Sequence, residues 1–310
     1  MSAMAWFRQQ SQRAYNAAMR HRLAQVVIFS GACLLANKPH VQAQSAACPP
    51  PSASASDDNQ PSGPKVSIAE VTFSGSLQMP ISDQDQIADS IKQKDDGNSL
   101  DGLIDDAVER VKAGWQNHGY FKVQVSGEDR TLTSSPANQR IALSFRVEEG
   151  LQYTLGEITF KNNKVFSDVA ALRGLFPING GDIFSREKIA TGLESLSKAY
   201  GEAGYVNFVS IPDTKFDDGK RIVDLEIDVD EGKMFHMGDV NFVGLDEPTK
   251  LELLKNFPMK RGQVYNGRLL ESFLLRHAST FPDGCASSRW QDEKTGTVTA
   301  TFDCRPCRID

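Results

Sequence analysis

The chain has 310 residues, of which 40% are hydrophobic and 24% are charged, and its formal net charge is −6. This length suits one large or several small soluble domains, and the mildly acidic composition lacks the basic excess that marks nucleic-acid binding. The five cysteines do not form the regular pattern of a small disulfide-stapled protein.

The chain begins with the features of an export signal. Residues 1–22 are basic and contain no acidic residue, and residues 23–36 are mostly apolar. We predict a secretory signal peptide over residues 1–43, cleaved after Ala43. The alternative is a membrane anchor, but fourteen apolar residues span only about 21 Å of helix, against a hydrocarbon core of about 30 Å.

Two details of this segment stay open. Translation can start at Met1, Met4 or Met19, and a lipoprotein signal lacks its aliphatic residue before Cys33 and before Cys48. Residues 44–65 are rich in Pro, Ser and Ala and lack the apolar content needed to order a core, so we predict a disordered linker there.

The remaining chain is internally repetitive. The run IAEVTFSGS (68–76) recurs as LGEITFKNN (155–163) and MGDVNFVGL (237–245). Three further signatures recur once, in the same order. They are WQNHGYFKVQV (115–125) with YGEAGYVNFVS (200–210), LSFRVEEG (143–150) with LEIDVDEG (225–232), and LFPINGGDIFS (175–185) with NFPMKRGQVYN (256–266). Gly150 and Gly232 are 82 residues apart, as are Ile158 and Val240, which indicates one repeated unit.

The sequence pattern of each unit predicts the element order β-α-α-β-β. A short strand opens it, with alternating inward residues such as Val71 and Phe73. A short helix follows, for which Ser167 is the expected N-cap in the second unit, and then a longer amphipathic helix ends at a glycine, Gly119 or Gly204. The last two strands form a hairpin whose period-two alternation predicts one buried and one solvated face.

These motifs resemble the POTRA (polypeptide-transport-associated) domain of outer-membrane assembly and secretion proteins of the BamA and TamA type. The resemblance covers residues 66–306 and implies an α+β fold of three tandem POTRA-like domains, each a three-stranded mixed sheet with two helices on one face. We place them at 66–150, 151–232 and 233–307. The family continues into a β-barrel, and because this chain ends at Asp310 we expect the periplasmic, partner-binding part alone.

The resemblance also implies where clients bind, because in this family the second strand of each sheet is an edge to which an extended peptide can add. It maps to about 121–126, 206–210 and 285–290. The predicted client-binding residues are Phe121, Lys122, Val123, Gln124, Val125, Val206, Asn207, Phe208 and Val209. Lys122 and Gln124 are expected to keep the empty edge soluble. The alternative is that these strands only complete each domain.

The C-terminal cysteines predict a structural disulfide. Cys285 begins the second strand of the third unit and Cys304 ends its third strand, so the hairpin places them opposite each other. We predict Cys285–Cys304, with Cys285–Cys307 as the alternative. The Cys304–Cys307 pair has redox-motif spacing, but it follows a strand rather than opening a helix, so we expect neither redox nor zinc chemistry.

No catalytic motif, metal site or cofactor site is predicted. The acidic residues over 213–230 alternate along a strand and lack calcium-loop spacing, which indicates a solvated face. We predict a non-enzymatic periplasmic scaffold, indirectly associated with the outer membrane, that binds β-barrel proteins, their unfolded forms or accessory envelope proteins, and no nucleic acid. The alternative is an envelope adaptor in cell division or surface secretion.

Overall fold

The computed structural model describes residues 65–93, 102–135, 138–282 and 285–305. The predicted signal peptide with Ala43, nearly all of the predicted linker, and Cys307 lie outside them. The chain divides into two compact units. The first runs to Leu196 and includes Ser210–Asp228, and the second contains Ser197–Val209 and the chain from Val229 onward.

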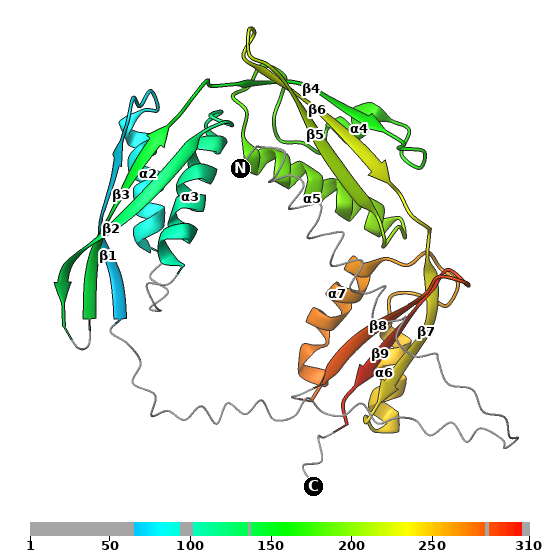
Figure 1. Ribbon diagram of the computed structural model, residues 1–310. Coiled ribbons are helices and arrows are strands. Elements are labelled where there is room, and N and C mark those ends of the chain that lie inside the picture. The colour runs from blue at the N-terminus through cyan, green and yellow to red at the C-terminus, as the bar shows by residue number, and fades with distance from the viewer. Residues whose placement is uncertain (1–64, 94–101, 136–137, 283–284, 306–310) are drawn as a thin grey trace, which may run out of the picture. The chain divides into compact units, whose positions relative to one another are not determined.

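The first repeat has the predicted element order. It consists of β1 (Lys65–Ser74), α2 (Ile81–Gln93), α3 (Leu103–Asn117), β2 (Gln124–Ser134) and β3 (Asn138–Glu148). Strand β3 lies at the centre of the sheet, parallel to β1 and antiparallel to β2. Both helices lie along one face of this sheet (Figure 1). The alternating side chains of β3, such as Leu143 and Phe145, are buried and share a core with Val111 and Trp115 of α3.

The second and third repeats follow the same plan. The second contains β4 (Thr154–Lys161), α4 (Val169–Arg173), α5 (Arg186–Glu202), β5 (Val209–Asp217) and β6 (Ile222–Asp230). The third contains β7 (His236–Val243), α6 (Glu247–Asn256), α7 (Gly267–Arg276), the 3-10 turn η1 (Ala278–Thr280), β8 (Ala286–Asp292) and β9 (Thr297–Asp303). Their sheets have the orders β4-β6-β5 and β7-β9-β8, each with its last strand at the centre. The predicted α+β fold of three mixed three-stranded sheets is confirmed; the exact domain boundaries stay predictions.

The expected cap at Ser167 is wrong by one residue. Helix α4 begins at Val169, and Asp168 is its N-cap, with a side-chain oxygen that accepts a hydrogen bond from the Ala171 N–H at 3.1 Å. Either residue type can cap a helix, so the sequence pattern could not choose between neighbours. The helix ends at Arg173, whose guanidinium donates to the Phe176 and Ile178 carbonyls.

The predicted glycine stops are confirmed. Gly119 and Gly204 follow the ends of α3 and α5 with φ angles of 85° and 91°. Only glycine adopts this left-handed conformation without a steric penalty, so it ends the helix and redirects the chain toward the next strand.

Candidate functional site

The candidate binding surfaces are the open edges of the three sheets. Among the described residues, β2, β5 and β8 each pair with one neighbouring strand, so on each of them one row of backbone N–H and C=O groups has no partner strand from the described part of the chain. The opposite edges belong to β1, β4 and β7, and each of these strands has a register shift in its pairing with the central strand. Such irregularities disfavour the addition of another strand. The pairing of β8 with β9 has none, so in the third repeat the β8 edge is the better candidate.

Most residues predicted for these edges lie before the strands. Phe121, Lys122 and Val123 precede β2, and only Gln124 and Val125 belong to it. The chain first makes a turn, in which the Val123 N–H donates to the Tyr120 carbonyl at 3.1 Å. Phe121 and Val123 are buried, with exposed fractions of 2% and 3%. Buried and exposed side chains do alternate over residues 121–124. This alternation could not show that a turn comes before the paired strand β2.

The same correction applies to the second repeat. Val206, Asn207 and Phe208 precede β5, which begins at Val209. The Phe208 N–H donates to the Tyr205 carbonyl at 3.1 Å, and the Phe208 ring stacks on Tyr200 with centroids 4.1 Å apart. Only the last of the four predicted residues is therefore on the edge strand.

Lys122 does not protect a sheet edge. Its ammonium forms an ion pair with Asp218, in the turn between β5 and β6, with distances of 2.7 and 3.0 Å to the two carboxylate oxygens. The two residues are 96 positions apart in the sequence. No local pattern could have revealed this partner.

The β8 edge is regular in its pairing and largely exposed. All seven of its residues pair with β9 without a register shift, whereas the β2–β3 pairing shifts between Thr131 and Thr133. Residues 286–290 are all exposed, and 58% of the Trp290 surface is accessible. The predicted third edge, 285–290, agrees with β8 to within one residue at its start.

Backbone direction on β8 follows from the neighbouring pairs. The Cys304 N–H donates to the Val243 carbonyl at 2.8 Å, which turns it toward β7 and away from β8. Phe302, two residues before Cys304, also directs its backbone groups toward β7. Hydrogen-bonded and non-hydrogen-bonded pairs alternate along antiparallel strands, so Phe302 and Ser287 form a non-hydrogen-bonded pair, and the Ser287 N–H points toward the open edge. Arg289, opposite Ala300, does the same. These donors are available to an added strand.

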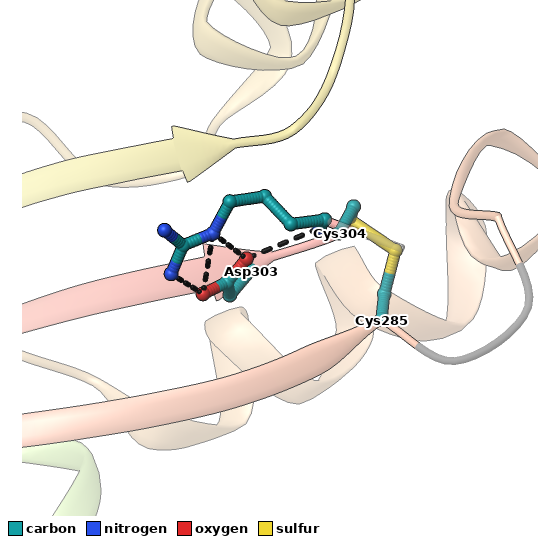
Figure 2. Close-up of a disulfide and its surroundings, with 4 residues drawn as sticks. Cys285, Asp303 and Cys304 are labelled. Carbon is teal, nitrogen blue, oxygen red and sulfur yellow. Dashed lines mark hydrogen bonds and ion pairs between the residues drawn. A yellow bond between two sulfur atoms is a disulfide. The ribbon is translucent and has the colours of Figure 1, made fainter. Parts of the chain in front are cut away.

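The predicted disulfide is present. Cys285 and Cys304 are bonded, with Cα atoms 4.2 Å apart (Figure 2). They flank the paired residues Ala286 and Asp303, so the bond closes the open end of the β8–β9 hairpin.

The disulfide replaces an apolar contact of the first repeat. Phe145 and Phe302 pair with the phenylalanines of their opening strands, Phe73 and Phe242, so they occupy equivalent positions. Two residues after Phe145, Val147 lies opposite Val125. The same two positions in the third repeat hold Cys304 and Cys285.

Sequence reasoning missed the role of the glutamates that close the first two repeats. Glu149 is buried and accepts hydrogen bonds from the N–H groups of Gln78 and Met79 and from the Trp115 indole. The equivalent Glu231 accepts from the Tyr200 hydroxyl at 3.0 Å. A sequence pattern for this role was present. The Glu-Gly pair directly after the last strand and the aromatic residue near the end of the longer helix occur together in the first two repeats.

The described residues also bear on membrane-spanning helices and metal sites. No helix among them is long and apolar enough to cross a membrane. Within residues 65–305, apart from the undescribed gaps, His, Cys, Asp and Glu side chains do not gather in any group of three or more that could hold a metal ion.

Comparison with known proteins assigns the repeat. Residues 66–150 and 153–232, more than half of the chain, match the family model described as POTRA, surface antigen variable number repeat. The chain belongs to the POTRA family. The third POTRA repeat lies outside the match but has the same element order as the other two.

Curated relatives and a solved structure agree with this assignment. The chain is 26% identical over 181 residues to the outer membrane protein assembly factor BamA of Neisseria meningitidis, covering 55% of this chain and 22% of that protein. It is 25% identical over 221 residues to a putative outer membrane protein assembly factor of Treponema pallidum, covering 68% and 25%. The chain thus spans about a quarter of the length of these relatives.

The solved POTRA3-5 fragment of Haemophilus influenzae BamA superposes with a TM-score of 0.58 at 20% identity, covering 78% of this chain and 96% of the fragment. This likeness shows the fold of the tandem POTRA repeats.

Proposed function

We propose that this chain is a non-enzymatic periplasmic scaffold in outer-membrane protein assembly or secretion, and that it binds partner proteins or unfolded outer-membrane clients by strand addition. The observation that carries the proposal is the open β8 edge, which is continuous in register, exposed and supplied with outward N–H groups at Ser287 and Arg289. Backbone pairing is largely indifferent to sequence, which suits a protein that receives many clients.

The cellular setting rests on two independent supports. The basic and apolar N-terminal segment predicts export, and the matched relatives are named as outer membrane protein assembly factors. An exported POTRA chain would meet its partners at the outer membrane without spanning it through the repeats.

Trp290 adds side-chain affinity at this edge. It lies opposite Thr299, between the positions of the buried Val298 and Ala300, so its ring is on the solvated face of the sheet. An added strand would place alternate side chains on that face. Aromatic or β-branched side chains, which are frequent in barrel strands, would pack on the indole.

An NMR titration of the isotopically labelled chain with peptides from outer-membrane β-barrel strands tests this function. The expected result is a shift of the β8 amide resonances in the parent and in Ser287→Ala, which keeps the outward N–H. Ser287→Pro removes that donor without breaking a hydrogen bond to β9, so the peptide should no longer shift these resonances. Shifts that are absent from β2, β5 and β8 alike would contradict strand addition.

Crosslinking in cells tests the assembly role separately. A photoreactive residue at Arg289 should capture outer-membrane barrel proteins or their precursors. Capture of inner-membrane division or surface-secretion complexes alone would instead favour the envelope-adaptor function.

A further inference from the structure

The loop after α3 forms a backbone junction with the start of the second repeat, within the first compact unit. The Gly119 carbonyl accepts a hydrogen bond from the Tyr153 N–H at 2.9 Å, and the Tyr153 carbonyl accepts one from the Phe184 N–H at 3.0 Å. A Cβ atom on Gly119 would lie 2.7 Å from the Tyr153 oxygen. Two features therefore require a glycine at this position: its positive φ angle and the close approach of the Tyr153 carbonyl oxygen.

The same junction occurs again within the second unit. The Gly204 carbonyl accepts from the Phe235 N–H at 2.9 Å, and the Phe235 carbonyl accepts from the Tyr265 N–H at 3.0 Å. A Cβ atom on Gly204 would lie 2.9 Å from the Phe235 oxygen. The Gly-Tyr signature therefore encodes a way of joining consecutive repeats as well as a helix stop.

A side-chain contact accompanies each junction. It joins the residue three positions after the junction glycine to the turn of the hairpin in the following repeat. At the first junction this is the Lys122–Asp218 ion pair, and the Tyr153 hydroxyl also donates to the Asp218 carboxylate at 2.7 Å. At the second junction it is a hydrogen bond from the neutral Asn207 amide to Glu293 at 3.0 Å. The position is the same, but only the first contact pairs two opposite charges.

Aromatic rings surround the first contact. The Lys122 ammonium lies 4.7 Å from the centroid of the Phe216 ring and 5.3 Å from that of Tyr153. The Phe216 ring also contacts Phe121, with centroids 5.3 Å apart. An exposed ion pair alone contributes little to stability, but here ring faces attract the cation and a tyrosine hydroxyl orients the carboxylate.

We infer that Lys122, Asp218 and Tyr153 form a charge-dependent contact that fixes the orientation of the first repeat against the second. The corresponding contact at the second junction, made by Asn207 and Glu293, has no such dependence on an ion pair. Screening or competition for Lys122 would therefore free the first repeat while its own core stays folded. The hydrogen bonds from Lys122 and then from Tyr153 lower the pKa of Asp218, and the hydrogen bond to Asp218 raises the pKa of Lys122.

Distance measurements by pulsed electron resonance on the full chain test this inference. Spin labels attached to a genetically encoded ketone residue at Asp106 and at Ser167, both exposed, leave the cysteines untouched. The parent should give a narrow distance distribution at low salt, and Lys122→Met should lose it. The charge reversal Lys122→Asp with Asp218→Lys should restore it in part. Lys215→Met is the matched control, because it removes an exposed ion pair within the second sheet and should leave the distribution narrow.

Salt provides a readout that needs no variant. At about 1 M salt the screening length falls to about 3 Å, so the parent distribution should broaden toward that of Lys122→Met, which should itself respond little. A parent distribution that stays narrow at high salt, together with a narrow distribution in Lys122→Met, would overturn the inference. Backbone bonds and ring packing would then hold the repeats without the charges.

Discussion

Replacing Glu149 by alanine should destabilise the first repeat far more than the replacement of a charged residue at the end of a strand usually does. Only 3% of Glu149 is exposed. Its carboxylate accepts hydrogen bonds from the Gln78 N–H at 2.6 Å, the Met79 N–H at 3.1 Å and the Trp115 indole at 2.9 Å. These donors belong to the loop after β1 and to α3, so one side chain connects three segments that are distant in sequence.

The magnitude follows from the donors that the substitution leaves behind. A buried donor without a partner costs about 1–3 kcal/mol. A groove lined by Gln78 and Glu149 borders the site, so water can reach the Gln78 N–H after truncation. The indole of Trp115 is fully buried and loses its partner outright. We therefore expect a total loss near the lower end of the combined range, about 3 kcal/mol in the free energy of unfolding.

Urea unfolding of the full chain, followed by the fluorescence of Trp115, measures this loss. Glu148→Ala is the matched control, because the neighbouring carboxylate is exposed and its ion pair with Arg146 is long, at 3.9 Å. The control should change the free energy of unfolding by less than about 0.5 kcal/mol. Glu149→Gln should fall between the two, since it keeps one acceptor oxygen. Equal stabilities of Glu149→Ala and Glu148→Ala would refute the role of the buried carboxylate.

Three further predictions concern the disulfide, a glycine and a carboxylate. Changing both cysteines of the disulfide to serine opens a loop with a sequence separation of 19 and should lower the stability of the third repeat by about 3 kcal/mol; unchanged hydrogen exchange in β8 and β9 would contradict this. Gly119→Ala should cost more than Gly102→Ala, because both residues have φ near 85° but a Cβ on Gly102 would meet nothing within 4 Å; chemical denaturation of the two variants compares them directly. The pKa of Asp218 is lowered in the folded protein. Its carboxylate therefore stabilises the fold at pH values above the unfolded-state pKa of about 3.9, and this stabilisation is lost as the pH falls through the folded-state pKa. Carboxyl NMR titration should place its midpoint below 3.9 in the parent and closer to that value in Lys122→Met; identical midpoints would show that the ion pair does not perturb it.

Short-range physics explains what could be read from the sequence. Period-two alternation identified the central strands, because a half-buried strand must alternate. The φ requirement of a chain reversal identified Gly119 and Gly204 as helix stops. The register of the last hairpin placed Cys285 opposite Cys304, because the buried face and the turn together fix the register of a hairpin. These features, together with the threefold recurrence, determined the element order and the POTRA fold.

Tertiary structure decided which side chains meet across the repeats. Lys122 lies near a predicted edge strand, yet its partner Asp218 comes from the next hairpin, and the turn at Val123 moves β2 further along the chain. Glu149 looks like an exposed charge beside Gly150 until the loop at Gln78 closes over it. The Lys122–Asp218 and Gln78–Glu149 contacts join residues 96 and 71 positions apart, and only the packing of whole elements brings such groups within hydrogen-bonding distance.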